Sequence, residues 1–470
     1  MILRNRRILY LIFVIIFFLV APPLVLYTSG FRYDFEYKRI VETGSLVIKS
    51  YPQNADVYIN EEKYPETSPC IINTILPGKI NLLISKEGYY DWAKTIDINP
   101  RVTTFEENIR LFAKSEPINI IQDNITKYWF NEKQDKFAYL NKDNQLRIFN
   151  TLNKKDTLIA NFDKKTLHDF KWSIHDDQFV FGRKDKTSIE YFVIDANSLD
   201  RIIPLSSITT LELQNIQWDP VDKNSLYALS NEELYRIPYL IKTIRLISSG
   251  KIKQYLVEDK RIILIQETEK KNLLLSWTTA KDQNTIHLLP FVNVTKNSII
   301  VNTNSHRIGL YNQDASELMI IDPSIQNSDT ENTVISISNV DKFYWTKDGQ
   351  KLIYTDKFGL YIQSFNTPIT IIPIQKYNKL IIKYSYPIKE IELSDNEAHI
   401  FYIVGNSLKV AELESSSEPR ITTLLDNLNQ AYELKLINNQ EYLTFIDSKS
   451  KLNGLSLSLE NSRPFFLRNE

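Results

Sequence analysis

The most apolar stretch of the chain runs from Ile8 to Tyr27 and contains no charged residue. An α-helix needs about 20 apolar residues to cross a hydrocarbon core that is ~30 Å thick. The pattern therefore predicts a transmembrane helix over residues 8–27. Pro22 and Pro23 fall inside this stretch and are tolerated as a kink, because neighbouring groups can satisfy the backbone carbonyls that they free.

Beyond Gly44 the pattern changes to short stretches in which apolar and polar residues alternate, such as SLVIKSY from Ser45 and ADVYIN from Ala55. A period of two indicates strands with one buried face, and the Pro-, Asn- and Gly-rich breaks between them indicate hairpin turns. Tyr, Phe, Ile, Val and Thr, which favour strands, are abundant. The chain is therefore expected to be all-β apart from its N-terminal helix.

One alternating unit, FYWTKDGQKLIYTD from Phe343, recurs along the chain. Each copy has an apolar anchor residue, and the anchors are Phe130, Trp172, Trp218, Leu256, Trp345, Leu393 and Leu436, with a degraded copy near Val292. Their mean spacing of about 44 residues is typical of a four-stranded propeller blade. The repeat therefore predicts a β-propeller of seven or eight blades, with eight preferred.

Each blade is expected to have four strands joined by short polar turns. In the sixth copy these strands are DKFYW, KLIYTD, GLYIQSF and ITIIPI, with a tight turn at Asp348 and Gly349. The anchor residues are expected to be core residues packed between blades. The stretch PINIIQ from Pro117 is expected to join the last blade near PFFLR from Pro464, because pairing the two ends of the chain protects their edges.

These patterns divide the 470 residues into more than one folded unit, as the length also requires. We expect a basic tip at residues 1–7, a transmembrane helix at 8–27 and a juxtamembrane linker at 28–43. A small β domain at 44–113 and a propeller at 114–470 are expected to follow.

Charge at the N-terminus predicts the orientation of the helix. Arg4, Arg6 and Arg7 precede it, so the positive-inside rule places the N-terminus in the cytoplasm and the bulk of this single-pass membrane protein outside. A signal peptide that is cleaved after Ala21 is the alternative. An uncleaved anchor is favoured, because the bulky Leu19 stands where cleavage needs a small residue.

Composition excludes several classes of function. The 56 basic and 57 acidic side chains leave a net charge of −1, which provides no electrostatic footprint for nucleic acid. The single Cys70 excludes a disulfide within the chain and a cysteine-based metal site. The G-x-S-x-G elbow, the P-loop and the G-x-G-x-x-G fingerprint do not occur.

The remaining polar residues do not form a recognisable catalytic, cofactor or metal motif. The acidic pair Asp176 and Asp177 is explained by its place in a turn. The five histidines are scattered without the spacing of metal ligands, at His168, His175, His287, His306 and His399. We therefore predict no catalytic, metal or cofactor-binding residue and no cofactor, and the pattern does not identify ligand-binding residues.

Several features follow one another in a fixed order from Gly44 to Leu111. They are an opening glycine, the strand LVIKS, Pro52 with Ala55, the strand VYIN, a Ser68-Pro69 step, a Pro77-Gly78 turn, the strand INLLISKE and a Gly88-Tyr89 pair. This series resembles the PEGA domain family, an all-β module of exported bacterial and archaeal proteins. The resemblance implies a small β-sandwich that contacts surface or envelope material and has no catalytic role.

Three aromatic residues close to the Gly-Tyr pair have two possible uses. Tyr89, Tyr90 and Trp92 could form a platform for a ligand, or they could pack the sheet. Packing is favoured.

The repeat itself has the form W-(S/T)-x-D-G-x-x-L-x-(Y/F), which is clearest in the copy that contains Trp345. This form resembles the repeat of TolB-like β-propellers rather than that of WD-repeat propellers. The resemblance covers residues 114–470 and implies a propeller.

The leading interpretation is a membrane-anchored, extracytoplasmic binding or scaffold protein of the cell envelope. A propeller face would bind a protein or polysaccharide partner without catalysis. The alternative is an envelope enzyme, a glycan lyase or hydrolase, which Asp, Glu, His or Tyr residues gathered at one end of the propeller channel would favour. A sensor that signals to the cytoplasm is disfavoured, because residues 1–7 leave no room for an output domain.

Overall fold

The structure is a computed structural model. It describes residues 2–28, 30–34, 39–162, 165–175, 178–186, 188–258, 261–267, 273–279, 283–289, 298–302, 307–321, 334–365, 378–413, 419–428, 430–437 and 441–459.

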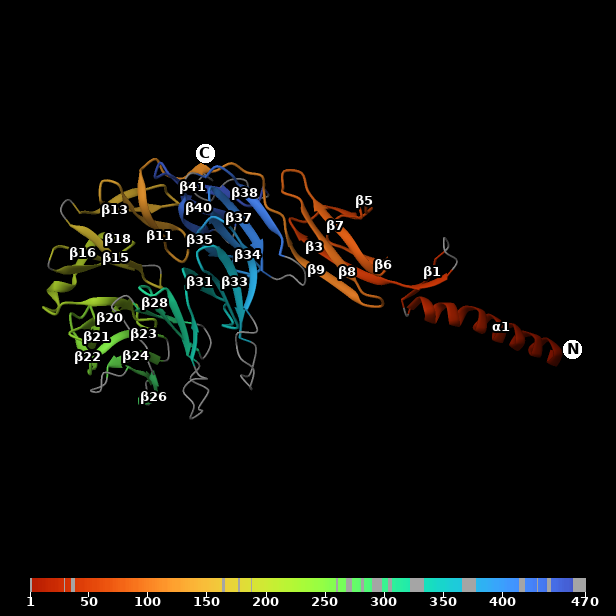
Figure 1. The fold of residues 1–470 in the computed structure, drawn as a ribbon, viewed down its shortest axis with the longest axis horizontal. Coiled ribbons are helices and arrows are strands. Elements are labelled where there is room, and N and C mark those ends of the chain that lie inside the picture. Colours follow the sequence, from red (N-terminus) through yellow and green to blue (C-terminus); the bar gives the residue numbers. More distant parts are fainter. Residues whose placement is uncertain are drawn as a thin grey trace. The chain divides into compact units, whose positions relative to one another are not determined.

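The chain forms two compact units. The first contains Met1–Glu116 together with Val410–Leu424 and Leu455–Ser462, and the second contains Pro117–Lys409 and Leu425–Gly454. The regular elements among the described residues are one α-helix, one short 3-10 helix and strands (Figure 1). The expected all-β fold with an N-terminal helix is therefore confirmed.

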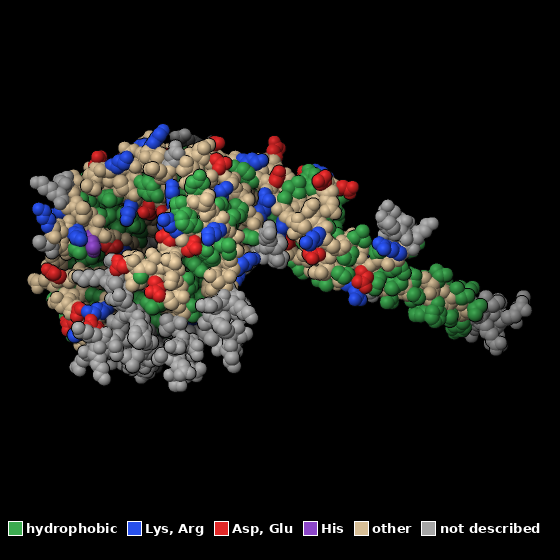
Figure 2. Space-filling view, in the orientation of Figure 1, with side chains coloured by type: hydrophobic (Ala, Val, Ile, Leu, Met, Phe, Trp, Pro, Cys, Tyr) green, Lys and Arg blue, Asp and Glu red, His purple; other side chains and the backbone are tan. Residues whose placement is uncertain are grey.

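The first unit begins with the apolar helix α1 (Ile2–Thr28), which contains Pro22 and Pro23. Its Tyr10–Thr28 part has a mean hydropathy of 2.6 and is long and apolar enough to cross a membrane. Figure 2 shows hydrophobic side chains along its visible face. A short antiparallel hairpin, β1 (Phe31–Asp34) and β2 (Arg39–Glu42), then forms within the stretch expected to be a linker.

Two sheets follow in this unit. One is three-stranded in the order β6-β3-β9, with β9 parallel to β3, and the other is four-stranded in the order β5-β4-β7-β8. Their strands are β3 (Gly44–Tyr51), β4 (Asp56–Ile59), β5 (Glu62–Lys63), β6 (Cys70–Ile75), β7 (Gly78–Ser85), β8 (Trp92–Ile98) and β9 (Thr103–Arg110).

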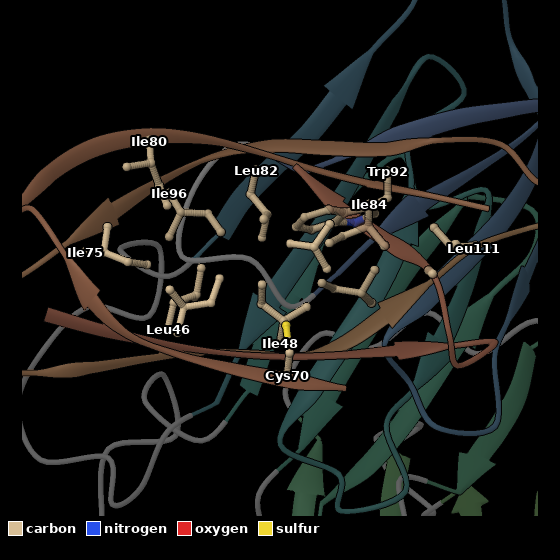
Figure 3. Packing of buried hydrophobic residues seen from close by; sticks show 14 of the residues in the cluster. Leu46, Ile48, Cys70, Ile75, Ile80, Leu82, Ile84, Trp92, Ile96 and Leu111 are labelled. Atoms are coloured by element: carbon tan, nitrogen blue, oxygen red, sulfur yellow. The ribbon is translucent and has the colours of Figure 1, made fainter. Parts of the chain in front are cut away.

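The core of the first unit lies between these two sheets. Every second residue of β3 points inward, so Leu46 and Ile48 are fully buried while Lys49 is exposed. They pack with Trp92 of β8 and with Leu111 (Figure 3). The expected small β-sandwich is therefore confirmed.

The rest of the chain forms eight four-stranded sheets among the described residues. This count agrees with the preferred number of eight blades, which stays a prediction. The first four sheets contain β11 (Ile125–Phe130), β12 (Lys136–Asn141), β13 (Gln145–Asn150) and β14 (Asp156–Asn161); β15 (Thr166–Trp172), β16 (Gln178–Lys184), β17 (Ile189–Asp195) and β18 (Ser198–Pro204); β19 (Gln214–Trp218), β20 (Ser225–Ser230), β21 (Glu233–Pro238) and β22 (Arg245–Ser248); and β23 (Ile252–Val257), β24 (Arg261–Glu267), β25 (Leu273–Thr279) and β26 (Gln283–Leu289).

The next three sheets also keep the order of the chain. They contain β27 (Ser298–Asn302), β28 (Ile308–Asn312), β29 (Glu317–Ile321) and β30 (Val334–Ile337); β31 (Lys342–Trp345), β32 (Lys351–Thr355), β33 (Gly359–Ser364) and β34 (Asn378–Lys383); and β35 (Ile388–Leu393), β36 (His399–Val404), β37 (Ser407–Glu412) and β38 (Ile421–Leu425). The short 3-10 helix η1 (Leu205–Ser207) follows β18.

The last sheet joins the two ends of the propeller sequence. Its order is β10-β41-β40-β39, with β10 (Ile118–Asn119), β39 (Tyr432–Ile437), β40 (Tyr442–Ile446) and β41 (Leu452–Ser456). The stretch PINIIQ therefore closes the ring as expected. Its partner is β41, where Ile118 lies opposite Gly454, rather than PFFLR, which lies outside the described residues.

Apolar cores between neighbouring sheets hold the ring together. Phe179 and Phe181 of the second sheet pack with Ala138 of the first, and Tyr128 of the first packs with Ile446 of the last. In Figure 1 the colours pass around this ring from orange through green to blue, so that the last sheet lies beside the first.

Two expectations about the repeat need correction. The fourth strand of the sixth sheet is β34, while ITIIPI lies outside the described residues. Trp218 is buried as expected, but Trp345 and most other anchors are only half-buried, because they stand at or close to the ends of the innermost strands. The turn at Gly349 is confirmed by its φ of 66°.

Candidate functional site

A pocket of about 1190 Å³ opens where the innermost strands β11, β15, β19 and β39 of the second unit end; we call it the mouth pocket. Four of the seven named anchors, Phe130, Trp172, Trp218 and Leu436, line it. Figure 2 shows a hollow in this unit bordered by acidic and basic side chains. The repeat thus places aromatic residues from sequence-distant strands around one opening.

The aromatic walls of the mouth pocket are held rigidly. The Trp129 ring stacks on Phe170 with 4.9 Å between centroids, and Trp172 lies edge-on to the same ring. The Trp172 indole N–H donates to the Trp129 carbonyl at 2.9 Å, and the Trp218 indole N–H donates to the Lys171 carbonyl at 3.2 Å. These bonds link β15 to β11 and β19 to β15, so the walls that these strands form are preorganised for binding.

Two lysines that line the mouth pocket are already paired. Lys171 Nζ lies 3.3 Å from Asp169 Oδ2 and donates to the Ile216 carbonyl at 2.7 Å. Lys435 Nζ lies 3.1 Å from Glu392 Oε2. Their charges are therefore largely neutralised within the pocket.

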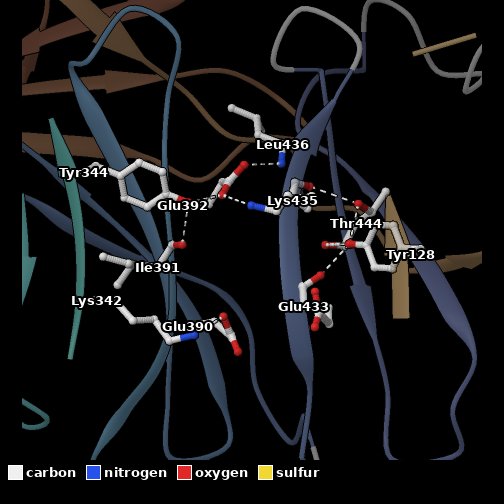
Figure 4. Close-up of polar contacts among 10 residues, drawn as sticks. All are labelled: Tyr128, Lys342, Tyr344, Glu390, Ile391, Glu392, Glu433, Lys435, Leu436 and Thr444. Carbon is white, nitrogen blue, oxygen red and sulfur yellow. Dashed lines mark hydrogen bonds and ion pairs between the residues drawn. The ribbon is translucent and has the colours of Figure 1, made fainter. Parts of the chain in front are cut away.

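Glu433, which lines the mouth pocket, has an unusual backbone conformation. Its backbone φ is 55°, in the left-handed region that a glutamate rarely adopts, at a bulge of β39. The Tyr128 hydroxyl donates to its carbonyl (Figure 4), whereas its carboxylate makes no hydrogen bond or ion pair with a described residue. Burial raises the pKa of this carboxyl, and Lys127 opposes the rise. Strained backbone of this kind is often found at functional sites.

A smaller pocket of about 360 Å³ shares Glu433 and Lys435 with the mouth pocket and is also lined by residues of β31 and β35. Beside it the Tyr344 hydroxyl donates to Glu392 at 2.6 Å, and Lys342 lies 2.7 Å from Glu390 (Figure 4). Burial raises the pKa of the Tyr344 phenol far above its ordinary value, so Tyr344 remains a hydrogen-bond donor.

The other residues singled out from the sequence do not join this site. Tyr89 and Trp92 are buried in the first unit, with 2% and 3% of their surfaces exposed, so the expected packing is confirmed. The Trp92 indole N–H donates to Glu412, which belongs to the same unit. His168 is exposed and His399 is buried.

Asp176, Asp177, Val292 and His306 lie outside the described residues, as does the side chain of His287. In the part of the chain that the structure describes, no group of three or more His, Cys, Asp or Glu side chains is arranged to hold a metal ion.

Sequence reasoning missed the charged residues of the innermost strands. Three strands each have two charged residues that stand two positions apart. The pairs are Asp169 and Lys171 on β15, Glu390 and Glu392 on β35, and Glu433 and Lys435 on β39. Residues two apart share a face of a regular strand, so the alternation in DFKW and KEIEL was an available signal, whereas the bulge at Glu433 interrupts the alternation in YELKL.

Comparison with known proteins identifies one family. Residues 43–113 match the PEGA domain family, which confirms the resemblance seen in the first β module. No curated protein matches the chain.

Solved propeller structures are also similar to this chain. The β-propeller domain of Cps50 (Swd1) from Myceliophteria thermophila is 14% identical, and the match covers 73% of this chain and 100% of that chain with a TM-score of 0.41. The Dos1 propeller is 12% identical, with 73% and 95% covered and a TM-score of 0.45. The WD40 domain of SCAP from fission yeast is 12% identical, with 76% and 96% covered and a TM-score of 0.43.

Proposed function

We propose that this chain is a membrane-anchored, extracytoplasmic binding or scaffold protein of the cell envelope. In this proposal α1 anchors the protein, the PEGA domain contacts envelope material, and the mouth pocket binds a protein or polysaccharide partner. No catalytic step and no cofactor is required.

The mouth pocket is the observation that carries this proposal. It is concave, its aromatic walls are preorganised, and Lys171, Glu433 and Lys435 add polar groups at fixed positions. Binding sites typically combine apolar walls with a few placed polar groups in this way. The volume of about 1190 Å³ suits a polypeptide loop or several sugar units better than one small metabolite.

The anchoring role is supported by the length and hydropathy of α1. A cleaved signal sequence would have the same properties, so the proposal includes the expectation that the helix is retained. Its outward orientation depends on the three arginines that precede the apolar stretch.

Site-specific photocrosslinking in cells tests the binding role. A benzophenone amino acid at Leu152, which lines the mouth pocket and is 62% exposed, should form adducts with an envelope component. The matched control is Leu158 on β14, which is 48% exposed and does not line this pocket. Equal adduct formation at both positions, or none at Leu152, would contradict the proposal.

An envelope glycan lyase or hydrolase remains the second candidate, because Tyr344, Glu390, Glu392 and Glu433 gather beside the smaller pocket. Glu392 and Glu390 are engaged by lysines, so Glu433, whose pKa burial raises, is the best candidate acid. Incubation of purified envelope glycan with the protein and with Glu433→Gln tests this role. Product release by the protein but not by the variant would establish an enzyme.

A further inference from the structure

We propose that the β1–β2 hairpin is a membrane-interfacial element, whose exposed Tyr33–Ile40 pair inserts into the phospholipid headgroup region beside α1. This inference rests on the proposed anchoring by α1. It adds a second membrane contact, made by the folded part of the first unit rather than by the helix.

The hairpin is tied to the C-terminal end of α1. Arg32 Nη1 donates to the Tyr27 carbonyl at 2.6 Å, and the Gly30 N–H donates to the same carbonyl at 3.3 Å. The Arg32 guanidinium also lies 3.7 Å from the centroid of the Tyr27 ring. A cation at a helix C-terminus satisfies free carbonyls and interacts favourably with the helix dipole. The hairpin therefore begins where the apolar helix ends.

The other side of the hairpin is tied to the sandwich of the same unit. The Thr43 N–H donates to the Gly30 carbonyl at 2.9 Å, and the Arg101 N–H donates to the Thr43 carbonyl at 3.0 Å. The Arg101 guanidinium lies 5.9 Å from the centroid of the Phe31 ring. These contacts hold the hairpin close to the end of α1 instead of leaving it as a free linker.

One face of the hairpin has an exposed apolar pair, while Glu42 on the same face, opposite Phe31, lies 3.6 Å from Arg101. Tyr33 and Ile40 are direct cross-strand partners, so their side chains share a face, and they are 51% and 56% exposed. Tyr27 at the end of α1 is 59% exposed. Phe31 lies on the same face as Tyr33, two residues earlier. The end of α1 and this face therefore both expose aromatic or aliphatic groups.

The headgroup layer has room for a short hairpin that begins at the end of α1. A bilayer with a ~30 Å core and a total thickness of about 40–45 Å has roughly 5–8 Å of headgroup region on each side. Phe31 and Tyr33 are separated by ~7 Å along an extended strand. Tyrosine is enriched at this level, because its ring is apolar and its hydroxyl is polar.

The opposite face of the hairpin carries the cationic groups. Arg32 and Arg39 alternate with the apolar residues; the Arg32 guanidinium is held at the end of α1, and Arg39 is exposed. An exposed guanidinium such as that of Arg39 can contact lipid phosphates while its alkyl stem lies along apolar surface. An amphipathic element that continues directly from an apolar helix suits a bilayer surface better than a protein partner.

Spin labelling of the full chain in vesicles of phosphatidylcholine and phosphatidylglycerol tests the inference. A nitroxide attached through Ile40→Cys should be several-fold more accessible to oxygen than to a water-soluble nickel chelate. The control is Phe105→Cys on β9, which is 62% exposed in the same unit and should be open to both reagents. Burial raises the pKa of the Cys70 thiol, so Cys70 should remain unlabelled.

The outcomes separate the two proposals. Extraction of the chain from vesicles by carbonate would overturn the anchoring by α1 and this inference with it. The chain could instead stay with the vesicles while the label at position 40 is as accessible to the nickel chelate as the label at position 105. That result would overturn only this inference. Protection from both reagents would indicate a protein contact and would also overturn it. If Ile40→Cys does not fold, Tyr33→Cys provides the same measurement.

Discussion

Trp92 is among the most enclosed side chains of the first unit. It is 3% exposed, packs against the core that contains Ile84 and Leu111, and donates its indole N–H to Glu412. Trp345 is half-buried, with its ring centroid 5.3 Å from that of Phe365. The energetic importance of a tryptophan here depends on its enclosure rather than on its place in the repeat.

Replacing these two tryptophans should have unequal effects. Trp92→Ala should lower the free energy of unfolding of the first unit by about 3–5 kcal/mol, because it leaves a cavity and an unpaired acceptor. Trp345→Ala should cost less, since part of its ring already contacts solvent. Urea unfolding followed by circular dichroism checks this order, with Phe at each position as the milder control. A larger loss at Trp345 would contradict it.

Glu412 should make the stability of the first unit depend on pH. Burial raises the pKa of its carboxyl. The hydrogen bond from Trp92 and the charges of Lys94 and Arg420 oppose the rise in this pKa. The charge of Glu106 adds to the rise. The folded state therefore binds the proton more tightly than the unfolded state. Stability should be highest below the unfolded pKa, which is about 4.3, and should fall as pH rises towards the folded pKa.

Glu412→Gln should remove this dependence, because the amide oxygen still accepts from Trp92 without carrying a charge. Its melting temperature should exceed that of the unmodified chain at pH 7, and the difference should shrink as the pH approaches 4.5. Scanning fluorimetry from pH 4 to pH 8 measures both, with the exposed Glu66→Gln as the charge-matched control. A lower melting temperature for the variant at every pH would refute the argument.

Six of the innermost strands have a backbone irregularity that directs their side chains, whereas β27 and β31 pair regularly. Register shifts occur near the start of β11, β15, β19, β23, β35 and β39. A bulge increases the local twist and re-aims the residues that follow it. In β39 the register shift includes Glu433, which lines the mouth pocket and the smaller pocket beside it.

Closure of the ring depends on one very short strand. The Ile120 N–H donates to the Leu452 carbonyl at 2.9 Å, next to the pairing of β10 with β41. Ile120→Pro removes this donor and should lower the propeller's unfolding free energy by about 3 kcal/mol, whereas Ile120→Val should be close to neutral. Thermal unfolding of both variants provides the measurement. Equal melting temperatures would show that closure does not depend on this bond.

At the scale of the whole molecule, the orientation of the chain can be tested directly. Protease added to cells with a permeable outer layer should degrade the propeller and leave an N-terminal tag protected, because three arginines precede the apolar stretch. Replacing Arg4, Arg6 and Arg7 by Glu should make the orientation mixed. Protection of the propeller in the unmodified chain would reverse the topology. A product that begins near Pro22 would instead show cleavage.

The sequence by itself determined the local features of this protein. The helix follows from a continuous apolar stretch, and the strands follow from alternation, as in Leu46 and Ile48. The repeat around Trp345 and the series from Gly44 indicated the propeller and the PEGA domain. These signals can be read without tertiary information, because hydropathy and periodicity depend on a few neighbouring residues.

Only the tertiary structure decided how distant residues meet. It paired Ile118 with Gly454, enclosed Trp92 beside Glu412, and left Trp345 half-buried. It also brought Glu433 to the pocket that Trp172 lines, although 261 positions separate them in the chain. Burial and pairing depend on which strands become neighbours after the ring closes, and no local pattern carries that information.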